Sequence, residues 1–404
     1  MKRLIYILIS MIPFFTSCEK GEDFNYQMSN LNEQDVDSIS LTANHDMMLN
    51  EKGNLLSLKL YLYKKIVKED KTHYYTLLES RAPQKAIAYC YVGEDGQEKE
   101  ISSPLIAGDM LNAGNYKVYA KVFGKKSNEL PLLVRKPESL NFPERNIDII
   151  FHVVEFGGLP VTEYRITAEF IKKKLDKANI AFRKISSTAP NAVDCKLNFI
   201  PVVNDEKGNL MEHPGCNFTF IPKEKIEDLD PTSKTVDYNS FIKKNRLFWG
   251  KGKVLNVWIV RTKKSVPTSA PGYIDQDLPE LKGLKLKIAD NSVELNPTDC
   301  GIVIEYNSFI KENLAMFLGK YLGLLPTSYS KNKVPAVDTD YCDDTFMYSS
   351  NDQSFEYKND PKRNIGFTSD NIMDTKSTGT TVSLDQAKRI NLILEHSPAR
   401  KIWK

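Results

Sequence analysis

Residues 311–330, KENLAMFLGKYLGLLPTSYS, constrain the fold of this 404-residue chain more than any other stretch. Apolar side chains recur here at steps of three and four residues, which is the spacing of one helix face: Ile310, Leu314, Phe317, Leu318, Tyr321 and Leu325. Gly323 offers a left-handed stop, and Pro326 cannot continue a helix. The sequence therefore predicts a buried helix that ends near Gly323. Taken alone, the pattern is also typical of an ordinary core helix.

The same stretch aligns with H-E-x-x-H-x-x-G-x-x-H, the zinc-binding motif of the metzincin metallopeptidases. Gly323 stands at the glycine of the motif. The two helical histidines, the third histidine and the catalytic glutamate are replaced, respectively, by Met316, Lys320, Pro326 and Phe317. With L-x-x-Y-L-G-L-L around the glycine and N-I-M-D at residues 371–374, the chain resembles the pappalysin-like metzincins, in particular the zinc-dependent metalloproteinase lipoproteins of Bacteroides-type bacteria.

The residues at these four positions lack the chemistry of the motif. Zinc-dependent hydrolysis of this kind uses two imidazoles one helical turn apart, a third nitrogen ligand, and a carboxylate that takes a proton from bound water. A thioether is a poor zinc ligand, an ammonium repels the cation, proline offers no side-chain lone pair, and phenylalanine cannot act as a base. The chain is therefore expected to be a pseudoprotease that holds neither zinc nor another cofactor.

Earlier segments extend the resemblance. Residues 147–155 are expected to form a central strand, and residues 167–183 a helix that Thr167 caps; together they resemble the opening of the family's catalytic domain. Residues 197–203 and 254–260 are expected to be further strands. The second of them resembles the strand that precedes the active-site helix.

Later segments complete the resemblance. The D-Y-C-D-D-T sequence at residues 340–345 matches a family segment, but no second cysteine follows Cys342, which puts the disulfide of the relatives in doubt. Met373 occupies the Met-turn, a packing element that reports the fold and not catalysis. A capping box at residues 383–386 begins a last helix. The resemblance covers residues 146–404 and implies an α+β metzincin-like domain there.

The N-terminus has the pattern of a bacterial lipoprotein signal. Two basic residues precede an apolar stretch at residues 4–15, which is too short to span a membrane, and Cys18 follows two small residues. Residues 1–18 are expected to be a signal peptide, with lipid on Cys18 of the mature protein. An ordinary secretory signal is the alternative. The polar residues 19–37 are expected to tether the protein to the outer membrane, and their first acidic residues resemble cell-surface signals.

Residues 38–136 show the alternation of β-strands. One series of apolar residues alternates with Ser57, Lys59 and two tyrosines, and comprises Leu56, Leu58, Leu60 and Leu62. Residues 114–120, GNYKVYA, resemble the last strands of bacterial immunoglobulin-like modules. A polar run with two prolines at residues 136–143 is the expected boundary. The predicted fold class is thus an all-β immunoglobulin-like sandwich followed by the metzincin-like domain.

Composition narrows the partners and the metal chemistry. A net charge of +3 argues against nucleic acid as the main partner. Beyond Cys18, the chain has an odd set of cysteines without a C-x-x-C pair, whose pairing stays open: Cys90, Cys195, Cys216, Cys300 and Cys342. His152 lies in an apolar strand and is expected to be a hydrogen-bonded core residue. The other four histidines lack ligand spacing, so no substitute zinc site is expected.

Three functions stay open. The favoured one is a zinc-free protein that binds a peptide or protein in the former cleft, where the Lys320 ammonium could anchor a carbonyl or carboxylate. Alternatively, the Lys320 side chain extends into solvent or forms an ion pair with a nearby acid. The second function is an active peptidase with displaced ligands. The third is a structural lipoprotein whose cleft is filled by Met316 and Phe317.

Overall fold

The computed structural model describes residues 30–137, 141–156, 166–222, 237–262, 266–289, 293–330, 334–351, 357–363, 365–375 and 379–400. The chain forms two compact units. Unit 1 comprises residues 1–40, 60–88 and 120–127, and unit 2 comprises residues 41–59, 89–119 and 128–404. The signal peptide, Cys18 and most of the predicted tether lie outside the described residues.

Unit 1 consists of strands and short turns. Residues 62–68 of β3 (Leu55–Lys68) pair antiparallel with β4 (Lys71–Leu77), across a turn in which Glu69 and Asp70 both have positive φ. Val122 of β8 (Gly114–Val122) pairs with β9 (Lys125–Lys126). Leu31 is buried and its N–H donates to Arg81 O at 2.8 Å, so this end of the predicted tether belongs to unit 1.

The N-terminal strands of unit 2 pair in three places. β10 (Leu130–Arg135) lies between β2 (Met47–Leu49), which is parallel to it, and β8, which is antiparallel. β5 (Ile87–Val92) pairs with β6 (Glu98–Ile101), and the start of β3 pairs with β7 (Leu105–Ala107). β1 (Ser38–Ala43) completes the strands of this region. The predicted alternation is confirmed, because Leu56, Leu58, Leu60 and Leu62 are all buried. That these strands form an immunoglobulin-like sandwich remains a prediction.

The two compact units divide at other residues, and the domain boundary expected at residues 136–143 stays a prediction. Within unit 2, Asn54 links the N-terminal strands to the chain after α2 (Ala168–Phe182). Its side chain is fully buried, and Nδ2 lies 2.9 Å from the carbonyl oxygens of Ala189, Pro190 and Ala192. The composition of a linker cannot predict hydrogen bonds between residues this far apart in the sequence.

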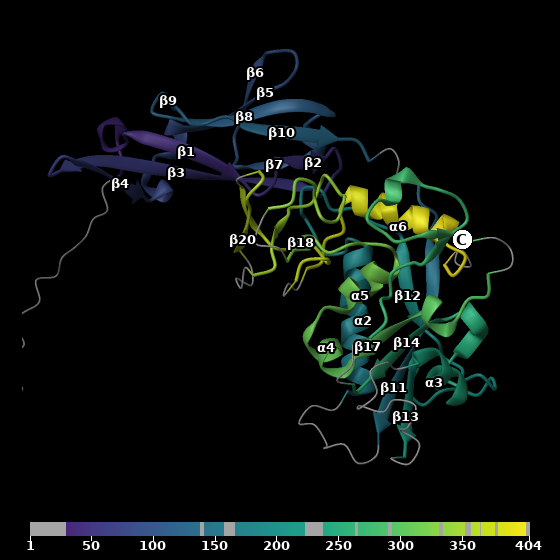
Figure 1. The fold of residues 1–404 in the computed structure, drawn as a ribbon. Coiled ribbons are helices and arrows are strands. Elements are labelled where there is room, and N and C mark those ends of the chain that lie inside the picture. Colours follow the sequence, from purple (N-terminus) through teal and green to yellow (C-terminus); the bar gives the residue numbers. More distant parts are fainter. Residues whose placement is uncertain are drawn as a thin grey trace, which may run out of the picture. The chain divides into compact units, whose positions relative to one another are not determined.

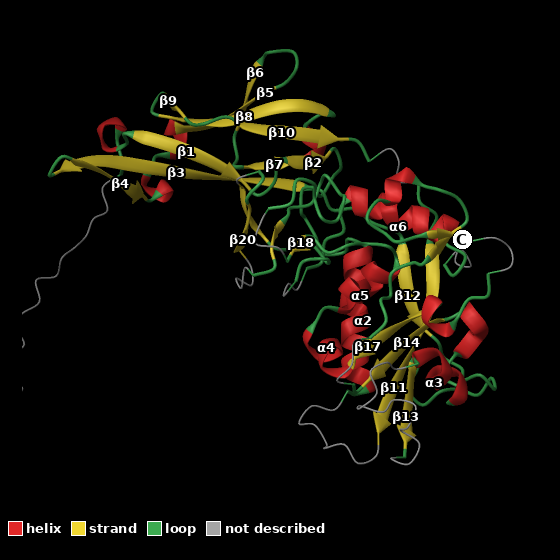
Figure 2. Cartoon of the chain, viewed as in Figure 1, coloured by secondary structure: helices red, strands yellow, loops and turns green. Residues whose placement is uncertain are grey.

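A parallel sheet forms the centre of unit 2 (Figures 1 and 2). Its order is β12 (Leu197–Pro201), β11 (Arg145–Phe156), β14 (Leu255–Val260) and β17 (Gly301–Glu305), and β13 (Cys216–Ile221) also pairs with β11. All pairings are parallel. The three strands expected from the sequence in this region are confirmed. β14 does not lead directly into the helix at residues 314–321, since β17 intervenes.

Helices cover both faces of this sheet (Figure 1). Residues 149, 151 and 153 of β11 pack into the main core with α2, whereas Val154 packs on the other face with Phe241 of α3 (Tyr238–Lys244). Thr167 caps α2 by accepting from Phe170 N at 3.2 Å, as predicted. A sheet buried on both faces explains why its strands are nearly continuous apolar runs.

The apolar stretch that the sequence singles out forms two helices, not one. α4 (Tyr306–Lys311) ends before Asn313, and α5 (Leu314–Tyr321) begins after it because Asn313 Oδ1 accepts from Ala315 N at 3.1 Å. Ile310 therefore lies in α4 and Leu325 lies beyond α5. Gly323 has φ +87°, which confirms the predicted left-handed stop.

α6 (Leu384–His396) is the last helix described. Ser383 and Gln386 form the predicted capping box, and Ala387, Ile390 and Leu394 are buried in the main core. Three short two-stranded pairings complete the fold: β15 (Tyr273–Ile274) with β16 (Lys287–Ile288), β18 (Ser328–Tyr329) with β19 (Tyr348–Ser349), and β20 (Tyr357–Asp360) with β21 (Ile365–Thr368).

Two further features concern the whole described chain. Five cysteines are buried: Cys90, Cys195, Cys216, Cys300 and Cys342. Burial raises the pKa of Cys216 and of Cys300 to about 11, so both thiols are protonated at neutral pH. Among the described residues, no helix is both long enough and apolar enough to cross a bilayer.

Candidate functional site

The helix α5 carries the positions at which a metzincin would bind zinc. Met316 is only 7% exposed and belongs to the main core. Phe317 is half-buried and packs against that core. Pro326 lies beyond the helix and is exposed. These side chains therefore fill space or face solvent, and none of them offers a strong zinc ligand.

Lys320 is half-buried on α5. Its Nζ lies 5.8 Å from the ring centroid of Phe317, a cation–π contact. Burial lowers the pKa of Lys320, and the nearby carboxylate of Glu312 opposes that shift. Lys320 forms no ion pair with the residues described here, so its charge is only partly compensated.

The Met-turn lies beneath α5. Met373 is fully buried, and its N–H donates to Asn371 Oδ1 at 2.9 Å. Asn371 and Gln386 exchange two side-chain hydrogen bonds of 2.8 and 3.0 Å, which tie the turn to the start of α6. Asp374 accepts from Thr327 Oγ1 at 2.6 Å. The turn is thus fixed from both sides.

His152 is the structural residue that the sequence predicts. It is fully buried in β11, with Nε2 2.9 Å from Asn256 Oδ1 and Nδ1 2.9 Å from Asn217 Nδ2. Burial lowers its pKa to about 4, so the imidazole is neutral at pH 7. His396 is also engaged, with Nδ1 2.9 Å from Asp275 Oδ1.

The donor set does not fit a catalytic zinc ion. The four motif positions offer a buried thioether, a phenyl ring, an ammonium and a proline. Within the described ranges, no group of three or more His, Cys, Asp and Glu side chains is arranged to hold a metal ion. That the protein binds no zinc stays a prediction to be tested.

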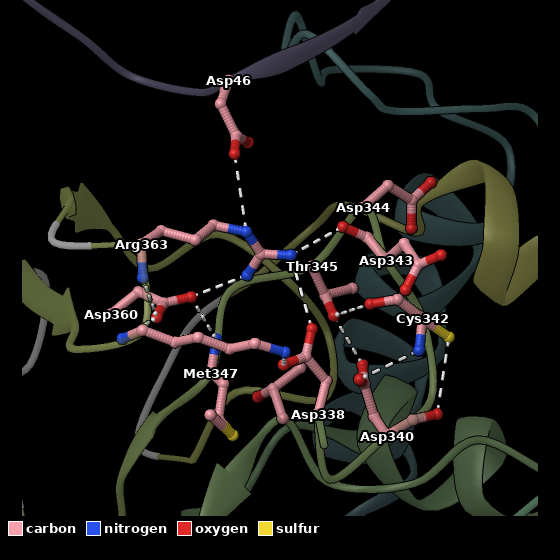
Figure 3. Close-up of polar contacts among 12 residues, drawn as sticks. Asp46, Asp338, Asp340, Cys342, Asp343, Asp344, Thr345, Met347, Asp360 and Arg363 are labelled. Carbon is pink, nitrogen blue, oxygen red and sulfur yellow. Dashed lines mark hydrogen bonds and ion pairs between the residues drawn. The ribbon is translucent and has the colours of Figure 1, made fainter. Parts of the chain in front are cut away.

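Around Arg363 lies a cluster of acidic residues that the zinc motif did not indicate (Figure 3). The guanidinium lies 2.7 Å from Asp360 Oδ2, 3.4 Å from Asp338 Oδ2 and 3.5 Å from Asp46 Oδ2. It also donates to Asp343 O at 2.7 Å. One half-buried cation thus connects segments that are distant in sequence. The sequence signal was the density of aspartates at residues 338–344.

Two carboxyl groups of this segment are buried, and of the two only Asp344 has a cation in close contact among the described residues. Asp340 accepts from Thr345 Oγ1 at 2.7 Å and from Cys342 N at 3.2 Å, and burial raises its pKa to about 7. Asp344 accepts from Ser383 Oγ at 2.6 Å, and burial raises its pKa to about 6. Asp344 also lies 3.4 Å from Arg135. These hydrogen bonds tie residues 340–345 to the start of α6.

Two adjoining pockets lie around residues 341–343, and α6 lines the larger one. They have volumes of about 660 and 580 Å³ and share Glu280, Tyr341 and Asp343 as lining residues. Arg389, which lines the larger pocket, donates from Nε to Gly323 O at 2.7 Å and from Nη2 to Lys282 O at 2.6 Å. Lys320 lines neither pocket.

Tyr341 lines both pockets and is 42% exposed. Its φ of +57° is unusual for an aromatic residue. Its ring lies against Gly283, where a side chain would clash with it. The position is therefore built to hold an exposed ring at this surface, which the sequence did not reveal.

Comparison with known proteins shows only distant structural similarity. No family model matches the chain, and no curated protein matches it. A Tannerella forsythia promirolysin mutant is 18% identical, with a TM-score of 0.44 over 66% of this chain and 85% of that chain. Mature T. forsythia mirolysin in complex with a cleaved peptide is 16% identical, with a TM-score of 0.42 over 65% and 96%. Mirolysin in complex with compound 9 is 17% identical, with a TM-score of 0.42 over 64% and 95%.

These structures are of a metalloprotease. Because the identities lie below 25% and the TM-scores below 0.5, nothing about zinc, activity or substrates follows from them for this chain. The pappalysin-like resemblance and the degenerate motif remain predictions that rest on the residues themselves.

Proposed function

We propose that this chain is a lipid-anchored cell-envelope protein that binds a peptide or an unfolded protein segment without cleaving it. The observation that carries the proposal is the pair of adjoining pockets around residues 341–343, in a chain whose motif positions do not fit zinc. Lipid on Cys18 would hold the protein at the outer membrane.

The pockets suit an extended chain. Each has the size of a small-molecule site, and together they offer room for neighbouring side chains on either side of Tyr341. An exposed aromatic ring held by the backbone loses little conformational freedom on binding. The lining also carries both signs of charge, with Asp343 and Glu280 near Lys362 and Lys388. Such a surface can pair with polar groups of a peptide while its ring packs on an apolar side chain.

Two other functions compete with this one. An active peptidase would need ligands displaced from α5, which the described part of the chain does not bring together. A structural lipoprotein would have a filled cleft, and the burial of Met316 favours that reading at α5 itself. The two pockets around residues 341–343 favour binding over a purely structural role.

The test uses fluorescently labelled denatured casein as the probe. Fluorescence anisotropy measures binding, and gel electrophoresis with and without a zinc chelator measures cleavage. We expect saturable binding, no chelator-sensitive cleavage, and about tenfold weaker binding for Tyr341→Asn, since an exposed aromatic anchor is worth about 1 to 2 kcal/mol. Asparagine tolerates the left-handed backbone of this position.

Tyr75→Asn is the matched control, because Tyr75 is 45% exposed in unit 1, and it should bind like the parent. Chelator-sensitive cleavage would establish the peptidase instead. Absence of saturable binding would leave the structural role. Loss of affinity in Lys320→Met but not in Tyr341→Asn would move the binding surface to α5.

A further inference from the structure

A separate pocket of about 620 Å³ lies between α2 and the junction of α4 and α5. Four apolar side chains form much of its wall: Phe170, Ile180, Ile310 and Leu314. Its volume is within the range of small-molecule sites in proteins. None of its lining residues belongs to the two pockets around residues 341–343.

The charge around this pocket is predominantly positive. Lys173, Lys174, Lys177 and Lys311 line it, against the two acids Asp176 and Glu312. Lys173 is paired, since its Nζ lies 2.9 Å from Glu169 Oε1, which leaves three lysines to set the charge. Asp176 is engaged outside the lysine set, since Lys172 Nζ lies 2.6 Å from its Oδ2. Lys177 and Lys311 are exposed and make no ion pair with described residues. The rim therefore attracts an anion.

Lys174 brings a cation to the apolar wall. Its Nζ donates to Glu312 O at 2.7 Å and lies 5.3 Å from the ring centroid of Phe170 and 5.5 Å from that of Phe309. Burial lowers the pKa of Lys174 to about 8, and the like charge of Lys177 adds to the effect. An anion bound at Lys177 would reduce the repulsion between these two ammonium groups.

The side-chain amide of Asn313 in this wall is already used within the protein. Asn313 Nδ2 donates to Gly379 O at 2.8 Å, and Asn313 Oδ1 accepts from Ala315 N. A peptide would need partners for its own N–H and C=O groups along this wall. A hydrocarbon chain would not, so the wall suits an aliphatic body better than a peptide.

We propose that this pocket binds an aliphatic carboxylate, with its hydrocarbon chain on the wall of Ile180, Ile310 and Leu314 and its carboxylate between Lys177 and Lys311. The apolar wall supplies affinity through burial, and the lysines select for negative charge. This site is independent of the proposed peptide-binding surface and of whether the protein binds zinc.

The test is isothermal titration calorimetry with decanoate, below its micelle concentration, on the full folded chain. Decanol and butyrate are the comparison ligands, because the first lacks the charge and the second lacks most of the chain. The test variant is Lys177→Gln/Lys311→Gln, which changes two exposed residues and leaves the core untouched. The matched control is Lys207→Gln/Lys243→Gln, which removes the same charge from exposed positions outside the pocket.

Saturable binding of decanoate is expected, at least about tenfold tighter than that of decanol or butyrate. The pocket variant should weaken decanoate binding about tenfold and the control variant should not. Equal affinity for decanol, equal weakening in the two variants, or no saturable binding would each overturn the proposal. Tighter binding of an acetylated leucine-rich peptide than of decanoate would overturn it as well.

Discussion

Gly319 lies directly above Met373: a Cβ placed on Gly319 would come within 2.8 Å of Met373 Sδ. α5 and the turn that contains Met373 are thus in contact at Gly319, where the residue must be small. Leu324 Cδ1 would be 3.2 Å from the same Cβ, so the space is closed from a second side. Protein side chains alone make this packing, so it needs no metal ion at α5.

The first prediction follows from this contact. Gly319→Ala should lower the free energy of unfolding by about 1 to 2 kcal/mol, because overpacking a full core outweighs the better helix propensity of alanine. Urea unfolding measures it. Adding Met373→Ala should cost less in the Gly319→Ala background than in the parent.

Gly272→Ala serves as the control for this experiment, since a Cβ there meets no atom within 4 Å. It should change stability by less than about 0.5 kcal/mol. Equal stability of Gly319→Ala and the parent would show that α5 and the Met-turn are not packed as described.

The second prediction concerns Asp340 and pH. Its pKa is raised by burial from 3.8 to about 7, so between these pH values the folded state binds a proton that the unfolded state has lost. Its contribution to stability is therefore present at pH 4 and is lost as the pH rises through 7, by up to about 4 kcal/mol. Asp340→Asn should remove this loss, so that its stability relative to the parent increases from pH 4 to pH 8.

Urea unfolding at several pH values gives the comparison. Asp343→Asn is the neighbouring control, because Asp343 is exposed. An Asp340→Asn variant whose stability runs parallel to that of the parent across this range would refute the prediction.

The third prediction has the opposite sign. The pKa of His152 is lowered by burial from 6.5 to about 4, so its contribution to stability is present above pH 6.5 and is lost as the pH falls toward 4, by about 3 kcal/mol. His152→Gln should remove this loss while keeping hydrogen-bonding groups near Asn256. The difference in unfolding free energy between pH 7 and pH 4.5 should shrink relative to the parent. His213→Gln, at an exposed position, should leave it unchanged.

The fourth prediction tests the anchor. Cys18→Ala should move the protein from the membrane to the soluble fraction, because a short apolar signal does not retain a chain by itself. Cell fractionation and immunoblotting measure this. Cys195→Ala is the control and should stay with the membrane. If both variants fractionate as the parent does, the lipid assignment is wrong.

Local patterns predicted much of the fold. The apolar spacing of α2, the Thr167 cap, the capping box of α6 and the glycine stop at Gly323 all appear where the sequence placed them. α4 escaped prediction because a six-residue helix has too few turns for a periodic signal, and its apolar residues merged with those of α5.

The candidate sites were harder to predict. Arg363 meets Asp46, Asp338 and Asp360, which are brought together only by the fold. The sequence did not indicate Tyr341, because its role depends on its backbone conformation and on contact with Gly283. Gly283 lies 58 residues earlier in the sequence. Resemblance pointed to the α5 positions, whereas the pockets around residues 341–343 and between α2 and α4 depend on long-range packing.

The most direct test of the central claim is the zinc content of the pure protein. The full chain is purified in the presence of zinc, dialysed against metal-free buffer, and analysed by inductively coupled plasma mass spectrometry. With Met316, Phe317, Lys320 and Pro326 at the motif positions, we predict no stoichiometric zinc. About one zinc ion per chain, removed by a chelator, would contradict the account.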